Sequence, residues 1–212
     1  MKRIIVIVIA VLSLCYCSKE DSQNSSDDKP KGKFIVFKDA VTKARLLEVY
    51  DLNNDAELSY SEAAAATSLI LSAFPSKGEV SVGSIKYLDE LQYFTGITAV
   101  KLVTSKQGAS MFIALQGISI PKNVTYIQSF GPSYGSFDDI SSEVKYLEYV
   151  KCYPTTPPSN VHYLLLSKNN TSILYVPKNS IEQYKERIRT ELTSLKIDAQ
   201  TIEKTLVRVK VF

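Results

Sequence analysis

The chain has a single histidine and three cysteines among its 212 residues, so few side chains are suited to nucleophilic or metal-assisted catalysis. A reactive thiol needs a base positioned beside it, and His162 lies ten positions from Cys152. We expect Cys152 to be a small buried apolar residue and His162 to be a structural residue. The adjacent carboxylates Asp138 and Asp139 would point to opposite faces of a strand, which does not suit a glycosidase pair. The sequence therefore predicts a protein that is not an enzyme.

The chain also lacks a strong net charge. Its formal charge is +3, and removal of residues 1–16, which include Lys2 and Arg3 but no acid, lowers it to +1. Basic residues form no block and do not alternate with aromatic ones. Nucleic acid is therefore not an expected partner.

Apolar runs long enough to cross a bilayer, which needs about 20 residues, are missing as well. The apolar run at residues 4–14 follows Lys2 and Arg3 and has the length of the apolar region of an export signal. A cysteine, and not a small-residue cleavage site, comes after it. This arrangement resembles a bacterial lipoprotein signal, in which the cysteine is acylated with fatty acids such as palmitate and becomes the mature N-terminus.

We expect Cys17 to carry the lipid, because Leu14 lies three residues before it and a polar stretch follows it directly. Cys15 is the alternative, although the bulky Leu14 immediately precedes it. Residues 1–16 are then a signal peptide. Residues 17–32, rich in Ser, Asp, Asn and Lys, are expected to form a flexible tether. The acidic stretch 18–21 resembles the tag that sends lipoproteins of some Gram-negative anaerobes to the outer face of the outer membrane; the alternative is a plain solvated spacer.

Oxygen-bearing residues at 51–62 follow the spacing of a twelve-residue calcium loop. Such a loop uses side-chain oxygens at positions one, three, five, nine and twelve and a backbone carbonyl at position seven. Position six, where glycine is usual, is Ala56, and a non-glycine residue at positive φ costs roughly 1–2 kcal/mol. The sequence predicts a weak Ca²⁺ site with Asp51, Asn53, Asp55, Glu57, Ser59 and Glu62 as ligands.

The same residues allow another interpretation, in which the loop holds no metal. Ser59 and Glu62 also have the spacing of a capping box at the start of a helix. Asp39 is placed to cap a helix that runs through Tyr50, and a second helix is expected from residue 60 to residue 74, before Pro75. Residues 33–76 would thus form an EF-hand-like helix–loop–helix.

Short apolar triplets recur at residues 97–102, 115–120 and 147–152. Each has the form L-x-x-I-x-I or a close variant, which is typical of the strand of a leucine-rich repeat. Their spacings, 18 and 32 residues, are irregular, so an ordinary mixed sheet is the alternative. We expect a degenerate repeat region at 84–178.

The last segment, 179–212, is expected to form a capping helix and a strand. Apolar residues recur at helical spacing from Ile181 to Leu195. Val207, Val209 and Val211 alternate with Arg208 and Lys210, which predicts a strand over 205–212.

Several of these strings together resemble the BspA-like leucine-rich repeat surface lipoproteins. The resemblance rests on the helix–loop–helix, on residues 89–98, on LQGISIPKNVTYI at 115–127, on LEYVKCYPTTPPS at 147–159 and on LYVPKNSIEQY at 174–184. It implies an α+β fold, in which the helix–loop–helix precedes a short solenoid that a C-terminal helix and strand cap. It also implies a surface-anchored, non-catalytic binding or adhesion module for a host or matrix protein or a glycan.

The chain departs from that family at residues 130–139, where two glycines and three aromatic residues replace a regular repeat. An adaptable loop bearing aromatic side chains suits ligand contact, so Phe130, Tyr134 and Phe137 are the candidate ligand-binding residues. They could instead cover the core. Two other functions remain as alternatives: a secreted glycan-active enzyme, and a calcium-dependent scaffold component, whose usual second loop copy is missing here.

Overall fold

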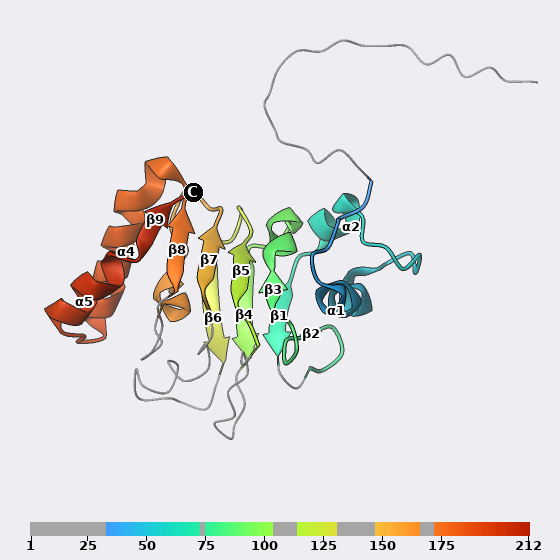
Figure 1. The fold of residues 1–212 in the computed structure, drawn as a ribbon, viewed down its shortest axis with the longest axis horizontal. Helices are drawn as coiled ribbons and strands as arrows, with labels where there is room; N and C mark the ends of the chain where they lie inside the picture. Colours follow the sequence, from blue (N-terminus) through green and yellow to red (C-terminus); the bar gives the residue numbers. More distant parts are fainter. Residues whose placement is uncertain (1–32, 73–74, 104–113, 131–146, 166–171) are drawn as a thin grey trace, which may run out of the picture. The chain divides into compact units, whose positions relative to one another are not determined.

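The computed structural model describes residues 33–72, 75–103, 114–130, 147–165 and 172–212, with side chains given for all of these except 129 and 130. Residues from Gly32 to Phe212 form one compact unit. Figure 1 shows its parallel strands side by side, with α1 and α2 beside β1 and β3, and α4 and α5 beside β8 and β9.

Two short helices open the described chain. Helix α1 (Ala40–Tyr50) begins at the predicted cap, because the Asp39 carboxylate accepts the Val41 amide at 2.9 Å. Helix α2 (Tyr60–Ala65) begins at Ser59, where the capping box is present. The expected helix from residue 60 to 74 is wrong beyond Ala65, since strand β1 (Leu69–Ser72) follows. The alanine run itself is helical, and Leu69–Ser72 pair with a distant strand in place of continuing the helix.

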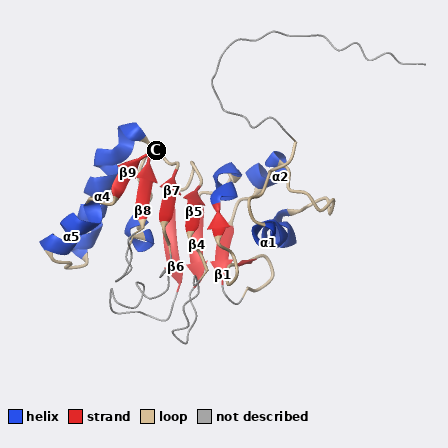
Figure 2. Ribbon diagram, in the orientation of Figure 1, coloured by secondary structure: helices blue, strands red, loops and turns tan. Residues whose placement is uncertain are grey.

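All the strands that the structure describes in its two sheets pair in parallel (Figure 2). The four-stranded sheet has the order β2-β1-β4-β6, and the five-stranded sheet has the order β3-β5-β7-β8-β9. The remaining strands are β2 (Val80–Ser81), β3 (Tyr87–Leu88), β4 (Ala99–Val103), β5 (Gly117–Ile120), β6 (Tyr126–Phe130), β7 (Tyr149–Cys152), β8 (Ile173–Val176) and β9 (Val209–Val211). Within the described ranges, the 3₁₀ turns are η1 (Asp89–Tyr93), η2 (Val161–Leu164) and η3 (Lys178–Ser180).

One core is shared by both sheets. Strand β4 buries Val100 and Leu102 and leaves its alternate residues partly exposed, and β7 does the same with Val150 and Cys152. These residues and those of the neighbouring strands belong to a single buried cluster. Strands β4 and β7 therefore turn one face inward and the other toward solvent, whereas all four residues of β5 are buried.

The expected α+β leucine-rich repeat solenoid is wrong. The fold is mixed α/β, with two parallel sheets of four and five strands. A solenoid would pair the three apolar triplets with one another in order, but 97–102 falls in β4 of the four-stranded sheet, whereas 115–120 and 147–152 fall in β5 and β7 of the other sheet. The triplet pattern reflects the alternate burial of any strand with one face in a core.

The C-terminal part follows the sequence prediction only in its first half. Helix α4 (Ile181–Ser194) buries Tyr184, Ile188 and Leu192, so the predicted apolar stripe is confirmed there. The stripe is wrong at Leu195, which follows the helix and is 48% exposed. The expected strand over 205–212 is wrong at its start, because helix α5 (Ala199–Leu206) occupies the preceding residues and β9 covers only Val209–Val211. Asp198 caps α5 by accepting the Thr201 amide at 2.9 Å. Val207 consequently lies outside the strand and is 67% exposed.

Candidate functional site

The loop between α1 and α2 carries the predicted calcium ligands, and burial and backbone hydrogen bonds hold its base in place. Leu58 is fully buried, and its carbonyl accepts the Ile35 amide at 2.8 Å. Phe34 and Ser59 form an antiparallel bridge beside it. Tyr50, the last residue of α1, donates its hydroxyl to the Ser68 carbonyl at 2.8 Å. The loop therefore has a fixed base formed by residues before α1 and after α2.

Inside the loop, side-chain oxygens accept backbone amides. Asp51 Oδ2 accepts the Ala56 amide at 3.0 Å, and Asp51 Oδ1 accepts the Asp55 amide at 3.3 Å. The Asn53 side-chain oxygen accepts the same Asp55 amide at 2.9 Å. Asp55 Oδ1 in turn accepts the Glu57 amide at 2.9 Å. These contacts turn the polar side chains toward the loop backbone.

The backbone at position six has the predicted left-handed conformation. Ala56 has φ of 62°, and Asn54 has φ of 57°. Asparagine tolerates this region because its side chain is short and polar, whereas alanine does so at a cost. The loop adopts its turn in spite of that cost.

Glu62 joins the two ends of the loop. Its Oε1 accepts the Leu52 amide at 3.1 Å, and its Oε2 accepts the Ser59 amide at 2.9 Å and the Ser59 hydroxyl at 2.7 Å. The Ser59 hydroxyl oxygen accepts the Glu62 amide at 3.1 Å, which completes the capping box. The hydrogen bonds from Ser59, and then the Leu52 and Asn53 amides, hold the pKa of the Glu62 carboxyl below its usual value.

The donor set of the loop fits a hard cation, since all the predicted ligands are oxygens. Within the described ranges, no group of three or more acidic, histidine or cysteine side chains is gathered closely enough to hold a metal ion. The three predicted carboxylate ligands, Asp51, Asp55 and Glu62, are therefore not gathered around one point in this structure. Asp51 accepts two hydrogen bonds and Glu62 accepts three, whereas a carboxylate has about four lone-pair sites, so some acceptor capacity remains.

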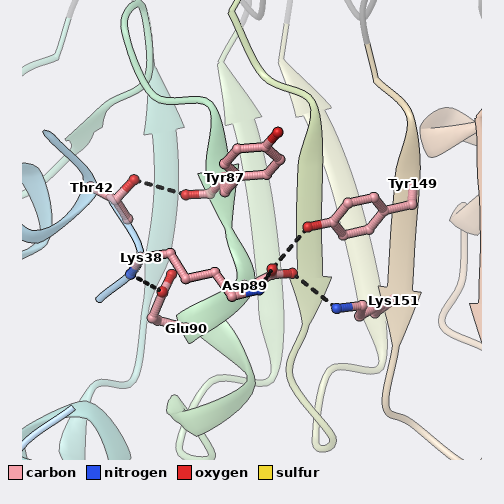
Figure 3. Close-up of polar contacts among 7 residues, drawn as sticks. All are labelled: Lys38, Thr42, Tyr87, Asp89, Glu90, Tyr149 and Lys151. Carbon is pink, nitrogen blue, oxygen red and sulfur yellow. Dashed lines mark hydrogen bonds and ion pairs between the residues drawn. The ribbon is translucent and has the colours of Figure 1, made fainter. Parts of the chain in front are cut away.

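A second polar cluster lies where β3 leads into η1, and it centres on Asp89 (Figure 3). The Asp89 side chain is only 5% exposed and accepts three hydrogen bonds: from Lys38 Nζ at 2.7 Å, from Tyr149 Oη at 2.8 Å and from Lys151 Nζ at 3.4 Å. Burial alone would raise the pKa of the Asp89 carboxyl. The hydrogen bonds from Lys38 and Tyr149 and the charges of both lysines outweigh it, so this pKa lies below its usual value.

The Asp89 cluster ties the segment before α1 to the sheet. The Lys38 amide donates to Glu90 Oε1 at 3.0 Å, and the Thr42 hydroxyl donates to the Tyr87 carbonyl at 2.8 Å. Figure 3 shows Lys38 and Glu90 on one side of Asp89 and Tyr149 and Lys151 on the other. The sequence analysis missed this cluster, because the partners of Asp89 lie 51 to 62 positions away and no local spacing marks them.

The other predicted site residues divide into those that the structure describes and those that it does not. Cys152 is buried as expected, and burial raises the pKa of its thiol. His162 is buried, with Nδ1 2.6 Å from Glu191 Oε2. The predicted lipidation residue Cys17 and the candidate ligand-binding residues Tyr134 and Phe137 lie outside the described residues. Phe130 ends β6, and its side chain is likewise outside them.

Comparisons with protein-family models, with curated proteins and with solved structures find no match for this chain. Of the helices that the structure describes, none is long and apolar enough to cross a membrane.

Proposed function

We propose that this chain is a surface-anchored lipoprotein that acts as a non-catalytic binding or adhesion module and carries a structural calcium loop at residues 51–62. The observation that carries the calcium part is the Asp51–Ala56 contact: the amide at position six donates to the carboxylate at position one while Ala56 is left-handed. This is the sharp turn that the loop spacing requires.

Calcium would neutralise the acidic side chains and hold the two helices at fixed ends of the loop. The ligands would be the side chains of Asp51, Asn53, Asp55, Ser59 and Glu62 and the carbonyl of Glu57. Because Leu58 is bridged to Ile35, order in the loop also supports the segment that precedes α1. The cation thus has a structural role and no part in a reaction.

A calcium titration of residues 18–212 tests the loop. Extracellular loops of this kind bind at about 10⁻⁴–10⁻³ M, and a concentration ten times the dissociation constant adds about 1.4 kcal/mol to the free energy of unfolding. We expect a higher melting temperature at millimolar Ca²⁺, and loss of the shift in Asp51→Asn and Glu62→Gln. Glu48→Gln is the matched control, because Glu48 lies on α1 outside the loop and pairs with Arg45 at 2.7 Å. Identical melting curves with and without Ca²⁺ would refute the loop as a metal site.

The anchoring and binding parts of the proposal rest on the sequence. Cys17 would carry the lipid at the outer membrane, facing the exterior, and residues 17–32 would be the tether. The partner would be a host or matrix protein or a glycan. The resemblance to BspA-like surface lipoproteins stays a prediction, and the repeat fold that it implied does not apply to this chain. Protease treatment of intact cells tests the location, because an outward-facing protein is cleaved and an inward-facing one is protected.

A further inference from the structure

The outward face of the five-stranded sheet bears aromatic and basic side chains. Strand residues Leu88, Val150 and Leu174 are buried in the core, and the residues that alternate with them are partly exposed. The partly exposed set comprises Tyr87 on β3, Tyr149 and Lys151 on β7 and Tyr175 on β8. This set is named the tyrosine face below.

Gly117 allows one of these rings to lie flat on the sheet. Tyr87 pairs with Gly117, and Gly117 pairs with Tyr149, so the glycine stands between the two tyrosines. A Cβ atom at Gly117 would lie 2.3 Å from Tyr149 Cζ, closer than any ordinary contact. The end of the Tyr149 ring therefore covers the glycine, with one ring face toward β5 and the other away from it.

The two tyrosine rings are nearly parallel. Their planes differ by 17°, and their centroids are 6.5 Å apart. Tyr149 is fixed in this orientation because its hydroxyl donates to the buried Asp89 carboxylate at 2.8 Å. Figure 3 shows Tyr87 and Tyr149 on either side of the strand that separates them. A rigid aromatic surface thus spans β3, β5 and β7.

The charges beside this surface are balanced. Lys38 and Lys151 both contact Asp89, and Lys151 Nζ also lies 4.9 Å from the centre of the Tyr149 ring. The Lys151 side chain is 33% exposed, so it can donate a hydrogen bond to a ligand beside the ring. A highly charged ligand would find its lysine partners already paired with Asp89.

We propose that the tyrosine face binds a neutral carbohydrate, whose sugar ring packs its C–H side on Tyr149 and Tyr87 while its hydroxyls bond to Lys151. Aromatic faces carry partial negative charge, which suits the weakly positive C–H groups of a sugar. The flat, preorganised surface suits a ring-shaped ligand and has hydrogen-bonding groups at its edge. This inference rests on the proposed binding function and names its ligand class; it does not depend on calcium.

Affinity electrophoresis of residues 18–212 tests the proposal with four soluble probes: xyloglucan, galactomannan and mixed-linkage β-glucan, which are neutral, and heparin, which is anionic. We expect at least one neutral polysaccharide to retard the protein. Tyr149→Ala should weaken that binding by about tenfold or more, as removal of a central aromatic contact does. Tyr149→Phe keeps the ring but loses the hydrogen bond to Asp89 that fixes it, so its affinity should lie between those of the parent and of Tyr149→Ala.

Gly117→Ala is the second test, because it displaces the ring without removing it. The atoms that the new Cβ meets belong to the far end of a side chain, so the variant should fold, as its melting temperature will show, and still bind weakly. Tyr126→Ala is the matched control: Tyr126 is 38% exposed on β6 of the other sheet, and its loss should leave binding unchanged. The triple change Phe130→Ser, Tyr134→Ser and Phe137→Ser tests separately the candidate ligand-binding residues that the sequence predicted.

Three results would overturn the inference. The first is that none of the neutral polysaccharides retards the protein. The second is that the folded Tyr149→Ala variant is retarded as strongly as the parent. The third is that only the triple variant loses binding, which would move the site to residues 130–139. Binding to immobilised fibronectin or gelatin without any polysaccharide binding would refute the carbohydrate and leave the proposed adhesion function standing. Absence of every one of these interactions would count against both.

Discussion

Lys38 lies two residues before α1, yet its ammonium is 2.7 Å from the Asp89 carboxylate, 51 positions further along the chain. The Lys38 side chain is 65% exposed and the Asp89 side chain is 5% exposed. Folding therefore removes much more water from Asp89 than from Lys38. Asp89 depends on the contact, because it is buried and must have its charge compensated. Lys38 does not, since water can solvate it equally well.

This asymmetry predicts unequal effects of substitution. Asp89→Asn removes the charge that Lys38, Tyr149 and Lys151 all contact, and it should lower the free energy of unfolding by about 1–3 kcal/mol. Lys38→Ala should cost less, about 1 kcal/mol, because Tyr149 and Lys151 still contact the Asp89 carboxylate. Urea denaturation of both variants measures the difference. Equal losses in the two variants would show that Asp89 is not the centre of the cluster.

The same carboxylate should make stability depend on pH. Its pKa is lower in the folded chain than usual, so its contribution is fully present above the unfolded pKa and is lost as the pH falls through the folded value. Glu62 has a lowered pKa and acts in the same direction. We therefore expect the free energy of unfolding to fall as the pH is lowered from about 5 through 4 and below. Denaturation at a series of pH values should give a shallower fall for Asp89→Asn than for the parent chain.

The strained position in the loop offers a substitution expected to stabilise. Ala56→Gly removes the cost of holding alanine in the left-handed region, which is roughly 1–2 kcal/mol. Glycine also increases the conformational entropy of the unfolded chain, and this offsets part of the gain in stability. The expected net gain is about 0.5–1 kcal/mol, together with tighter Ca²⁺ binding in the titration. Ala65→Gly, at an exposed position of α2, is the control and should destabilise by up to about 1 kcal/mol. A loss of stability in both variants would contradict the strain at Ala56.

The lipid anchor can be assigned by two single substitutions. We expect Cys17→Ala to leave an unlipidated precursor, because the cysteine thiol is the acceptor of the lipid. Cys15→Ala should mature normally. Metabolic labelling with a palmitate analogue, followed by gel analysis, distinguishes the two. Labelling that disappears only in Cys15→Ala would make Cys15 the anchor.

Local signals predicted local structure well. Asp39 caps α1, Ser59 and Glu62 form the capping box, and Tyr184 lies on the buried stripe of α4, all from contacts within a few positions. The cap at Asp198 is a signal of the same kind that the sequence analysis passed over in favour of the valine alternation.

Non-local pairing could not be predicted in the same way. The triplets at 97–102 and 115–120 have one apolar pattern, yet their strands belong to different sheets. Alternate burial says which face of a strand is inward but not which strand lies beside it. For the same reason the Asp89 cluster was missed: its members share no spacing, and only the folded sheet brings Tyr149 and Lys151 to Asp89.

The bridge between the segment before α1 and the loop has a mechanical consequence. A pull on the chain at Lys33 first loads the hydrogen bonds that Lys33 and Ile35 make with Tyr60 and Leu58, and only then the contacts of Lys38 with Asp89 and Glu90. The loop at 51–62 is therefore the first element under tension, ahead of both sheets. A cation that stiffens this loop would raise the force needed to separate the segment at Lys33 from the loop, and it would leave the sheets undisturbed.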